Sequence, residues 1–296
     1  MTRTKASRRV RLSLLTTAAV AVLAAAPFAA AASASASTGA SAGAATGTVS
    51  AQDTKINQQI LGYQAAHPDD LAGLDKLVFH FTGRHIAVRG NGMPKTLDGV
   101  QAQPYLDAAR QADARIDAKA GGRKLPVAAS GGIPAYSVNV TAVPLMGPPS
   151  MMRITGSWQF PDAWAGQDPP VDEASLGFTS LPTCVHQIGY AVNTYTYNMK
   201  STNLGYLENA NIANSAPIWA IKDGESGFVA QAGRGNVALT LENFCGRQQY
   251  GVTFQYDANQ GGSVVSVSAG FGFLTVSYNS PGLTRNEGTA PLYFTV

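Results

Sequence analysis

Residues 250–278 read YGVTFQYDANQGGSVVSVSAGFGFLTVSY, and this stretch decides the fold class. Polar and apolar residues alternate over 251–256 and again over 265–273. Alternation with a period of two places one set of side chains on each face of a β-strand. Asp257 to Gly262 supplies turn-forming residues between the two runs, which is typical of a β-hairpin. We therefore expect a β-rich domain built around this hairpin.

The second alternating run has two interpretations. In the first, Val265, Val267 and Phe271 are buried against a second sheet, as in the core of a sandwich. In the second, the run resembles the membrane-inserting hairpins of β-pore-forming toxins, whose polar face lines a channel while the apolar face meets lipid. The alternation changes phase near Phe273-Leu274, which makes each clean run short for a membrane strand. We therefore expect the buried arrangement.

From Ile133 onward the chain consists of β-type runs separated by Gly, Pro or Asn clusters. About ten such runs with short turns favour a β-sandwich or a barrel over residues 126–296, and their spacing leaves both open. The expected strands are 136–143, 151–160, 185–197, 217–221, 227–231, 237–241, 249–256, 264–270, 273–278 and 292–296.

Residues 1–34 have the parts of a secretory signal peptide. Basic residues precede an apolar run, and Ala32-Ser33-Ala34 offers a cleavage site. The Ala/Ser/Thr/Gly-rich residues 35–51 predict a disordered linker. Because the signal holds five Arg or Lys and no acidic residue, the net charge falls from +3 to −2 on cleavage. We expect a secreted, extracellular protein that binds no nucleic acid and keeps no membrane span.

Residues 52–125 predict a small α+β segment. Helical spacing and stop signals predict helices over 53–66 and 104–119. The runs 76–81 and 85–88 predict two strands, joined by a turn at Thr82-Gly83. The segment is compatible with a domain of its own, a propeptide, or a flap that packs on the β domain.

Cys184 and Cys245 are the only cysteines of the chain. In an exported protein, two cysteines most simply form a disulfide. We expect their Cα atoms to lie about 4.4 to 6.8 Å apart. The chain-entropy model assigns such a bridge a stabilisation of about 4 kcal/mol.

Two histidines suggest a metal site. If Thr82-Gly83 forms a two-residue hairpin loop, His80 lies opposite His85 on one face, and both imidazoles reach one ion. A third ligand has to come from elsewhere in the fold. The alternative is a pair of half-buried histidines packed beside Phe79.

A stretch dense in Tyr and Asn, residues 190–214, suggests a ligand-binding surface. Aromatic faces stack on apolar sugar or polymer surfaces, and amides both donate and accept hydrogen bonds. The candidates are Asn193, Tyr195, Tyr197 and Trp219. The alternative is a Tyr-bearing strand that lies half in the core, because strands favour Tyr.

The sequence has no Walker loop, dinucleotide fingerprint, EF-hand loop or zinc-finger spacing. We therefore assign no cofactor and no catalytic residue. Our first hypothesis is a non-enzymatic protein that binds a cell-wall polymer, a carbohydrate or a protein. The alternative is an extracellular hydrolase whose N-terminal segment resembles a propeptide. The third is a β-pore-forming or membrane-active protein.

Overall fold

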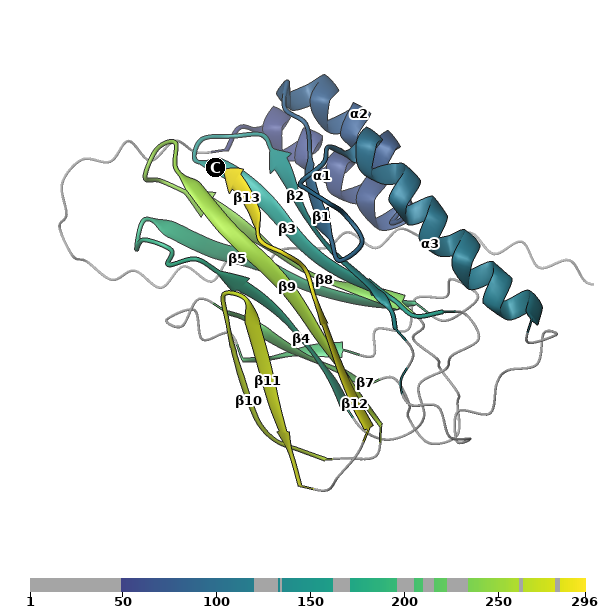
Figure 1. Ribbon diagram of the computed structural model, residues 1–296. Coiled ribbons are helices and arrows are strands. Elements are labelled where there is room, and N and C mark those ends of the chain that lie inside the picture. Colours follow the sequence, from purple (N-terminus) through teal and green to yellow (C-terminus); the bar gives the residue numbers. More distant parts are fainter. Residues whose placement is uncertain are drawn as a thin grey trace, which may run out of the picture. The chain divides into compact units, whose positions relative to one another are not determined.

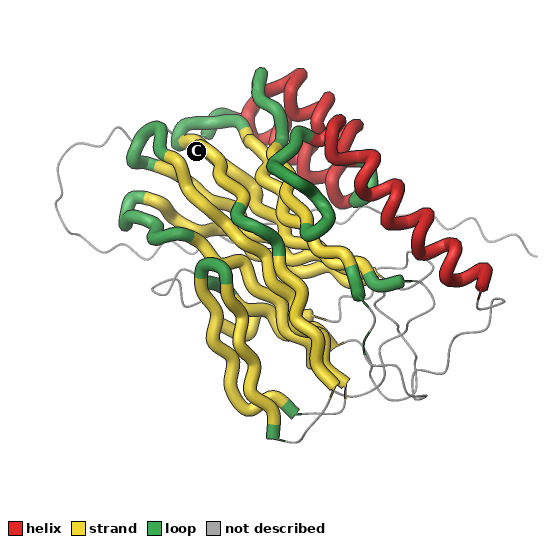
Figure 2. Tube along the Cα trace, in the orientation of Figure 1, coloured by secondary structure: helices red, strands yellow, loops and turns green. Residues whose placement is uncertain are grey.

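The computed structural model describes residues 49–119, 133, 135–161, 171–195, 205–209, 216–222, 234–260, 263–279 and 283–296 (Figure 1). The expected signal peptide, most of the expected linker and the expected strand 227–231 lie outside these ranges. The described part is mainly β, and its helices belong to the N-terminal segment (Figure 2).

Two antiparallel sheets form the body of the protein. The first has five strands in the order β1 (Ala87–Gly90), β2 (Ser137–Leu145), β3 (Ser150–Gln159), β8 (Arg234–Asn243) and β5 (Val185–Tyr195). The second has the order β12 (Leu283–Gly288), β9 (Gln249–Gln260), β4 (Val171–Phe178), β7 (Ile218–Lys222) and β6 (Gly205–Asn209), and β13 (Leu292–Thr295) also pairs with β9.

The main core lies between these two sheets. Alternate residues of the strands point inward and are fully buried, among them Val140, Ile154, Leu176, Leu239 and Phe254. Trp158 of the first sheet stacks on Tyr256 of the second, with ring centroids 4.5 Å apart. Face-to-face packing of two sheets defines a β-sandwich, which confirms the expected fold class.

Three helices cover part of the outer face of the first sheet: α1 (Ala51–Ala66), α2 (Leu71–Thr82) and α3 (Gly99–Lys119) (Figure 1). A second apolar cluster fills this layer, and it joins Ile60, Leu74 and Val78 of the helices to Val143 and Leu145 of β2. The outward-facing residues of β2 are therefore apolar where the helices cover them.

The expected strand over 76–81 is wrong, because this run is the second half of α2. The Asp70 side chain caps the helix by accepting the N–H of Gly73 at 2.8 Å. Gly83 ends it in the left-handed conformation, with φ 67°. Leu71, Leu74 and Val78 share its buried side. Burial of this helical stripe outweighs the β propensity of the apolar run.

The other two expected helices are confirmed with earlier starts. Ser50 caps α1 by accepting the N–H of Asp53 at 3.0 Å. Asp98 accepts the N–H of Gln101 at 2.8 Å, so α3 begins at Gly99 and Pro104 lies inside it. Pro104, the expected first residue of this helix, therefore lies in the second turn of α3.

The N-terminal segment shares a sheet with the C-terminal part of the chain, because β1 pairs with β2 along its whole length. The expected boundary near residue 125 falls outside the described residues. Three strands were not expected: β4, β6 and β12. These strands carry polar residues such as Asp172 and Glu173 in β4 and Asn286 in β12. Asp, Glu and Asn are residue types that are uncommon in strands, so the apolar alternation that predicts a strand was not evident.

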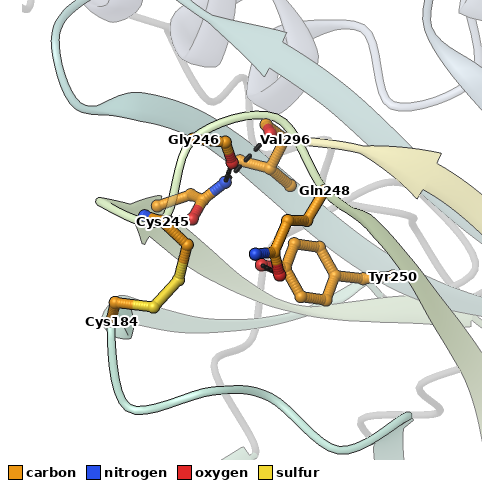
Figure 3. Close-up of a disulfide and its surroundings, with 7 residues drawn as sticks. Cys184, Cys245, Gly246, Gln248, Tyr250 and Val296 are labelled. Carbon is orange, nitrogen blue, oxygen red and sulfur yellow. Dashed lines mark hydrogen bonds between the residues drawn. A yellow bond between two sulfur atoms is a disulfide. The ribbon is translucent and has the colours of Figure 1, made fainter.

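The expected disulfide is present. It joins Cys184, just before β5, to Cys245, just after β8, and the two Cα atoms are 5.5 Å apart. Figure 3 shows the bridge beside Val296 at the end of the chain. The Asn243 side chain donates to the carbonyl oxygens of Gly246 and Val296, at 2.6 and 2.9 Å. The disulfide, the β5–β8 pairing and the C-terminus thus support one another at this end of the sandwich.

Candidate functional site

The stretch that alternates most clearly forms a small separate sheet. β10 (Val264–Gly270) and β11 (Phe273–Tyr278) pair with each other as an antiparallel hairpin, here called the tip hairpin. The expected pairing between 251–256 and 265–273 is wrong, because β9 pairs with β4, β12 and β13 instead. The turn of the tip hairpin lies at Phe271-Gly272, and Gly272 has φ 82°, a conformation that glycine adopts easily.

The change of phase near Leu274 is a consequence of this turn. Val267 lies opposite Val276, and Ala269 lies opposite Leu274. Paired residues share a face of a hairpin. The apolar residues of the two strands therefore fall on one face, although they have opposite parity in the sequence.

The two faces have different environments. On the apolar face Leu274 is buried, and Val267, Ala269, Val276 and Tyr278 are half-buried. On the other face the hydroxyl residues Ser266, Ser268, Thr275 and Ser277 are exposed. The tip hairpin lies over the outer face of β4 and β9 in the second sheet (Figure 1).

This placement corrects the expected burial of three residues. Val265 is 66% exposed, and it lies at an irregularity in the β10–β11 pairing. Val267 and Phe271 are half-buried. None of the three belongs to the core between the two large sheets, because β10 joins neither of them.

The tip hairpin continues the register of the β9–β12 pair. Gln260 lies opposite Leu283 in one pair, and Val267 lies opposite Val276 in the other. Both steps along the chain, from Gln260 to Val267 and from Val276 to Leu283, are seven residues. The pairs 255–260 with 283–288 and 266–270 with 273–277 therefore share one register, and an irregularity at Val264 and Tyr278 lies between them. Residues 255–270 and 273–288 are called the long ribbon below.

The long ribbon is folded back on itself. The Tyr278 hydroxyl donates to Asp257 of β9 at 2.7 Å, and the Gly272 N–H donates to the hydroxyl of Thr253 at 2.8 Å. A straight ribbon would carry Gly272 beyond Gln260 and away from Thr253. The tip hairpin instead runs back along β9, and its turn lies over residues near the start of that strand.

The surface beneath the tip hairpin is polar. Glu173, Ser175, Thr253 and Asp257 are outward-facing residues of β4 and β9, and all four are buried. Within the described part of the chain, Ser175 Oγ and one carboxyl oxygen of Glu173 have no hydrogen-bond partner. Burying a polar atom without a partner costs about 1–3 kcal/mol. An apolar hairpin face on a polar sheet face is therefore a poorly matched contact.

Two of these buried residues are carboxyl groups that lie opposite each other, because Glu173 and Asp257 are partners in the β4–β9 pairing. Burial, together with the neighbouring Glu208 and Asp257, raises the pKa of Glu173 to about 9. Burial also raises the pKa of Asp257, against the lowering effect of hydrogen bonds from Tyr278 and Asn286. Glu173 therefore holds its proton at neutral pH.

Close backbone packing holds the turn of the tip hairpin. A Cβ atom built on Gly177 of β4 would lie 2.5 Å from the carbonyl carbon of Gly270 and 2.9 Å from the amide nitrogen of Phe271. Real Cβ atoms essentially never approach backbone so closely. Gly177 is thus required for the hairpin to lie flat on β4.

The candidate ligand-binding residues do not form one surface in the described part of the chain. Trp219 is fully buried in the sandwich core, which leaves its ring no exposed face for a ligand. Asn193 is half-buried on the outer face of the first sheet and donates to Asn236 at 3.1 Å. Tyr195 is the last residue of β5, its side chain is not described, and Tyr197 lies outside the described residues.

The histidine candidates lose the hairpin that would have paired them. His80 lies on α2, is exposed and contacts the ring of Phe81. His85 lies after the helix, where it stacks on Phe79 and its Nδ1 lies 2.9 Å from Asp75 Oδ2. Among the described residues, no group of three His, Cys, Asp or Glu side chains could hold a metal ion. No helix in the same ranges is long and apolar enough to cross a membrane.

Sequence reasoning missed the residues of β4 and β9 beneath the tip hairpin. One signal could have found the long ribbon: no Asp, Glu, Lys, Arg or His lies between Asp257 and Arg285. The turn at Phe271-Gly272 is near the centre of this uncharged stretch. Symmetry of that kind is typical of a single hairpin with two long arms.

Comparison with known proteins identifies no family. No protein-family profile matches the chain, and no curated protein matches it. Among solved structures, a "Pore forming protein" matches at 9% identity over 54% of this chain and 84% of that one, with a TM-score of 0.25. Clostridium perfringens delta-toxin matches at 12% identity over 54% and 83%, with a TM-score of 0.26. The KRT10-binding region domain of the pneumococcal serine-rich repeat protein PsrP matches at 14% identity over 42% and 81%, with a TM-score of 0.23. At these scores the matches define neither a family nor a function.

Proposed function

We propose that this protein is exported and acts on lipid bilayers by releasing the tip hairpin and inserting the straightened long ribbon. The observation that carries the proposal is the shared register of β9–β12 and β10–β11. Because 266–270 with 273–277 and 255–260 with 283–288 share one register, straightening keeps these partners and changes only the irregular pairing at Val264 and Tyr278. The hairpin only has to leave the outer face of β4 and β9.

The length and chemistry of the long ribbon suit a bilayer. Each arm, residues 255–270 or 273–288, exceeds the roughly 9 to 11 residues that a membrane-crossing strand needs. The charged residues Asp257 and Arg285 stand at its base, and the stretch between them is uncharged. Its tip has one apolar face and one hydroxyl face, which suits contact with lipid on one side and water on the other.

The apolar part of the docked contact is small. Of the residues on the apolar face, only Leu274 is buried, and the others lie half-buried over polar groups. Release would let water reach Glu173, Ser175 and Asp257. This hydration offsets part of the lost apolar contact.

A single inserted hairpin has unpaired N–H and C=O groups along both edges, and these groups are costly in hydrocarbon. We therefore expect several copies to pair edge to edge in the membrane. Cross-linking on vesicles, followed by gel electrophoresis, should show oligomers that are absent without lipid.

A dye-leakage assay tests the proposal. The mature chain is added to phosphatidylcholine vesicles, with and without phosphatidylserine, that contain a self-quenched dye. We expect leakage from at least one composition. Val276→Asp, on the apolar face, should abolish leakage, while the neighbouring Ser277→Asp, on the exposed face, should retain it. No leakage from any vesicle, or equal leakage from both variants, would contradict membrane insertion.

A cysteine scan locates the inserted segment. Both native cysteines are in the disulfide, so an introduced cysteine is the only thiol available for a fluorophore. Lipid-borne quenchers should quench labels at 267, 269, 274 and 276 more than labels at 266, 268, 275 and 277. Equal quenching at all eight positions would mean that the hairpin lies on the membrane without an ordered apolar face.

A further inference from the structure

A cavity lies on the opposite face of the sandwich from the tip hairpin. It has a volume of about 110 Å³ and lies between the helices and the outer face of the first sheet. The end of α1, the start of α2 and part of α3 form one wall, and β2, β3, β8 and β5 form the other. The site is independent of the proposed membrane insertion, because it shares no residue with the tip hairpin or the surface beneath it.

The sheet wall carries a row of hydrogen-bonding side chains. Asn139, Ser157, Asn236 and Asn193 stand side by side on four neighbouring strands, and all four line the cavity. We call this row the polar ladder. Its rungs are about 4.8 Å apart, the spacing of paired strands. Ser157 donates to Asn139 at 2.7 Å, and Asn193 donates to Asn236 at 3.1 Å.

These bonds leave donors and acceptors for a ligand. Each amide side chain has two N–H donors and an oxygen with two lone pairs, and a hydroxyl can both donate and accept. The bonds within the polar ladder use only part of this capacity. The four side chains are half-buried, so a bound molecule can reach them.

The helix wall is mainly apolar. The apolar residues Leu61, Ala65, Pro68, Leu71, Leu74 and Leu106 line it, and Gln64, His67 and Asp69 add polar groups. One apolar wall facing one wall of amides and hydroxyls matches a sugar ring, which has an apolar face and a rim of hydroxyl groups. Aliphatic side chains supply the apolar contact, while precisely placed polar groups fix the orientation of the ligand.

Some of the charged side chains at and beside the cavity pair with one another. Arg234 Nη1 lies 2.7 Å from Asp69 Oδ2, and Arg110 also pairs with Asp69 at 3.1 Å. Arg153 donates to the carbonyl oxygen of Gly189 and to Thr240. Arg234 and Arg110 thus share the carboxylate of Asp69, whose negative charge would repel an anion, and Arg153 bonds to two neutral oxygens.

We infer that this cavity binds a neutral carbohydrate unit, whose hydroxyl groups bond to the polar ladder and whose ring packs against the helix wall. Asn193 would then bind the ligand together with Asn236, Ser157 and Asn139 of three other strands, and not with Tyr195 and Tyr197.

Saturation-transfer NMR tests the inference with defined probes. The mature chain is titrated with the methyl glycosides of glucose, galactose, mannose and N-acetylglucosamine, and with methyl glucuronide as an anionic probe. We expect transfer to at least one neutral glycoside and less transfer to the glucuronide. Absence of transfer to every neutral glycoside, or preference for the glucuronide, would overturn the assignment.

Two variants tie binding to the polar ladder. Ser157→Ala removes one hydroxyl, and Asn236→Leu replaces an amide with an apolar group of similar shape. Each should weaken binding by about fivefold or more, the effect of one hydrogen bond. Ser277→Ala, on the exposed face of the tip hairpin, is the matched control and should bind normally. Unchanged binding in both ladder variants, with the melting temperature retained, would place the sugar elsewhere. Leakage from carbohydrate-free vesicles is unaffected by any of these results, so the two proposals fail separately.

Discussion

Replacing Gly177 by alanine should lift the tip hairpin from the sandwich while leaving the core intact. The added methyl group would point at backbone atoms of Gly270 and Phe271, which cannot rotate away as a side chain can. Contacts below 3.0 Å force something to shift. The tip hairpin is the part that can move, because it belongs to neither large sheet.

The size of the effect follows from the contacts at the turn. Overpacking typically costs about 1–3 kcal/mol. The shift also strains the hydrogen bond from the Gly272 N–H to Thr253, which is worth about 1 kcal/mol. Because this cost falls on the docked state alone, a change of about 1–3 kcal/mol raises the released population by about 5- to 150-fold.

Hydrogen–deuterium exchange measures that population directly. Amides of β10 and β11 should exchange faster in Gly177→Ala, whereas amides of β8 in the sandwich core should keep their protection. Gly62→Ala is the matched control, since a Cβ at that position meets no atom within 4 Å. Leakage from vesicles should also become faster in Gly177→Ala.

One result would refute this reasoning. If the melting temperature falls and β8 loses protection while β10 and β11 keep theirs, the sandwich has yielded and the hairpin has not. The tip hairpin would then be a fixed part of the fold, and insertion of the long ribbon would lose its physical basis.

Four further predictions concern stability. Because the pKa of Glu173 is raised to about 9 in the folded protein, its contribution is fully present below about pH 4.5 and is lost as the pH rises through about 9. Urea titrations from pH 5 to 9 should thus show a fall on the order of a few kcal/mol in wild type and a smaller fall in Glu173→Gln. Reducing the disulfide between Cys184 and Cys245, or replacing both by serine, should lower the unfolding free energy by about 4 kcal/mol, because their separation of 61 residues closes a long loop; an unchanged urea midpoint would contradict this. Phe254→Ala should cost about 3–5 kcal/mol, because this ring is fully buried between the sheets. Phe271→Ala should cost less than about 2 kcal/mol, because that ring is half-buried at a turn; equal losses of melting temperature in the two phenylalanine variants would place Phe271 in the core after all.

Local patterns in the sequence were sufficient for several features. Alternation with a period of two specifies strands whatever their partners are, and most of the expected strands are present. Ser50 and Asp98 cap helices through local bonds to residues three positions away. The pairing of Cys184 with Cys245 followed because no other cysteine exists.

Other features depended on packing between distant segments. Run 76–81 has β propensity, yet it is helical because Leu74 and Val78 bury a stripe against the first sheet. Strand β4 carries two buried carboxyl groups: Asp172 accepts hydrogen bonds from the Tyr256 hydroxyl and the Asn259 N–H of β9, and Glu173 lies on the opposite face of β4, beneath the tip hairpin. No local pattern contains that information.

The candidate site shows the same division. The sequence by itself determined that residues 264–278 have apolar and hydroxyl faces and that an uncharged stretch surrounds them. Only the tertiary structure decided which partner each strand takes, because register depends on the turn and on contacts with other strands. It placed Val267 opposite Val276 and folded the pair back over β9. It also brought Asn139, Ser157, Asn236 and Asn193 into one row, from four strands that lie between residues 137 and 243 of the chain.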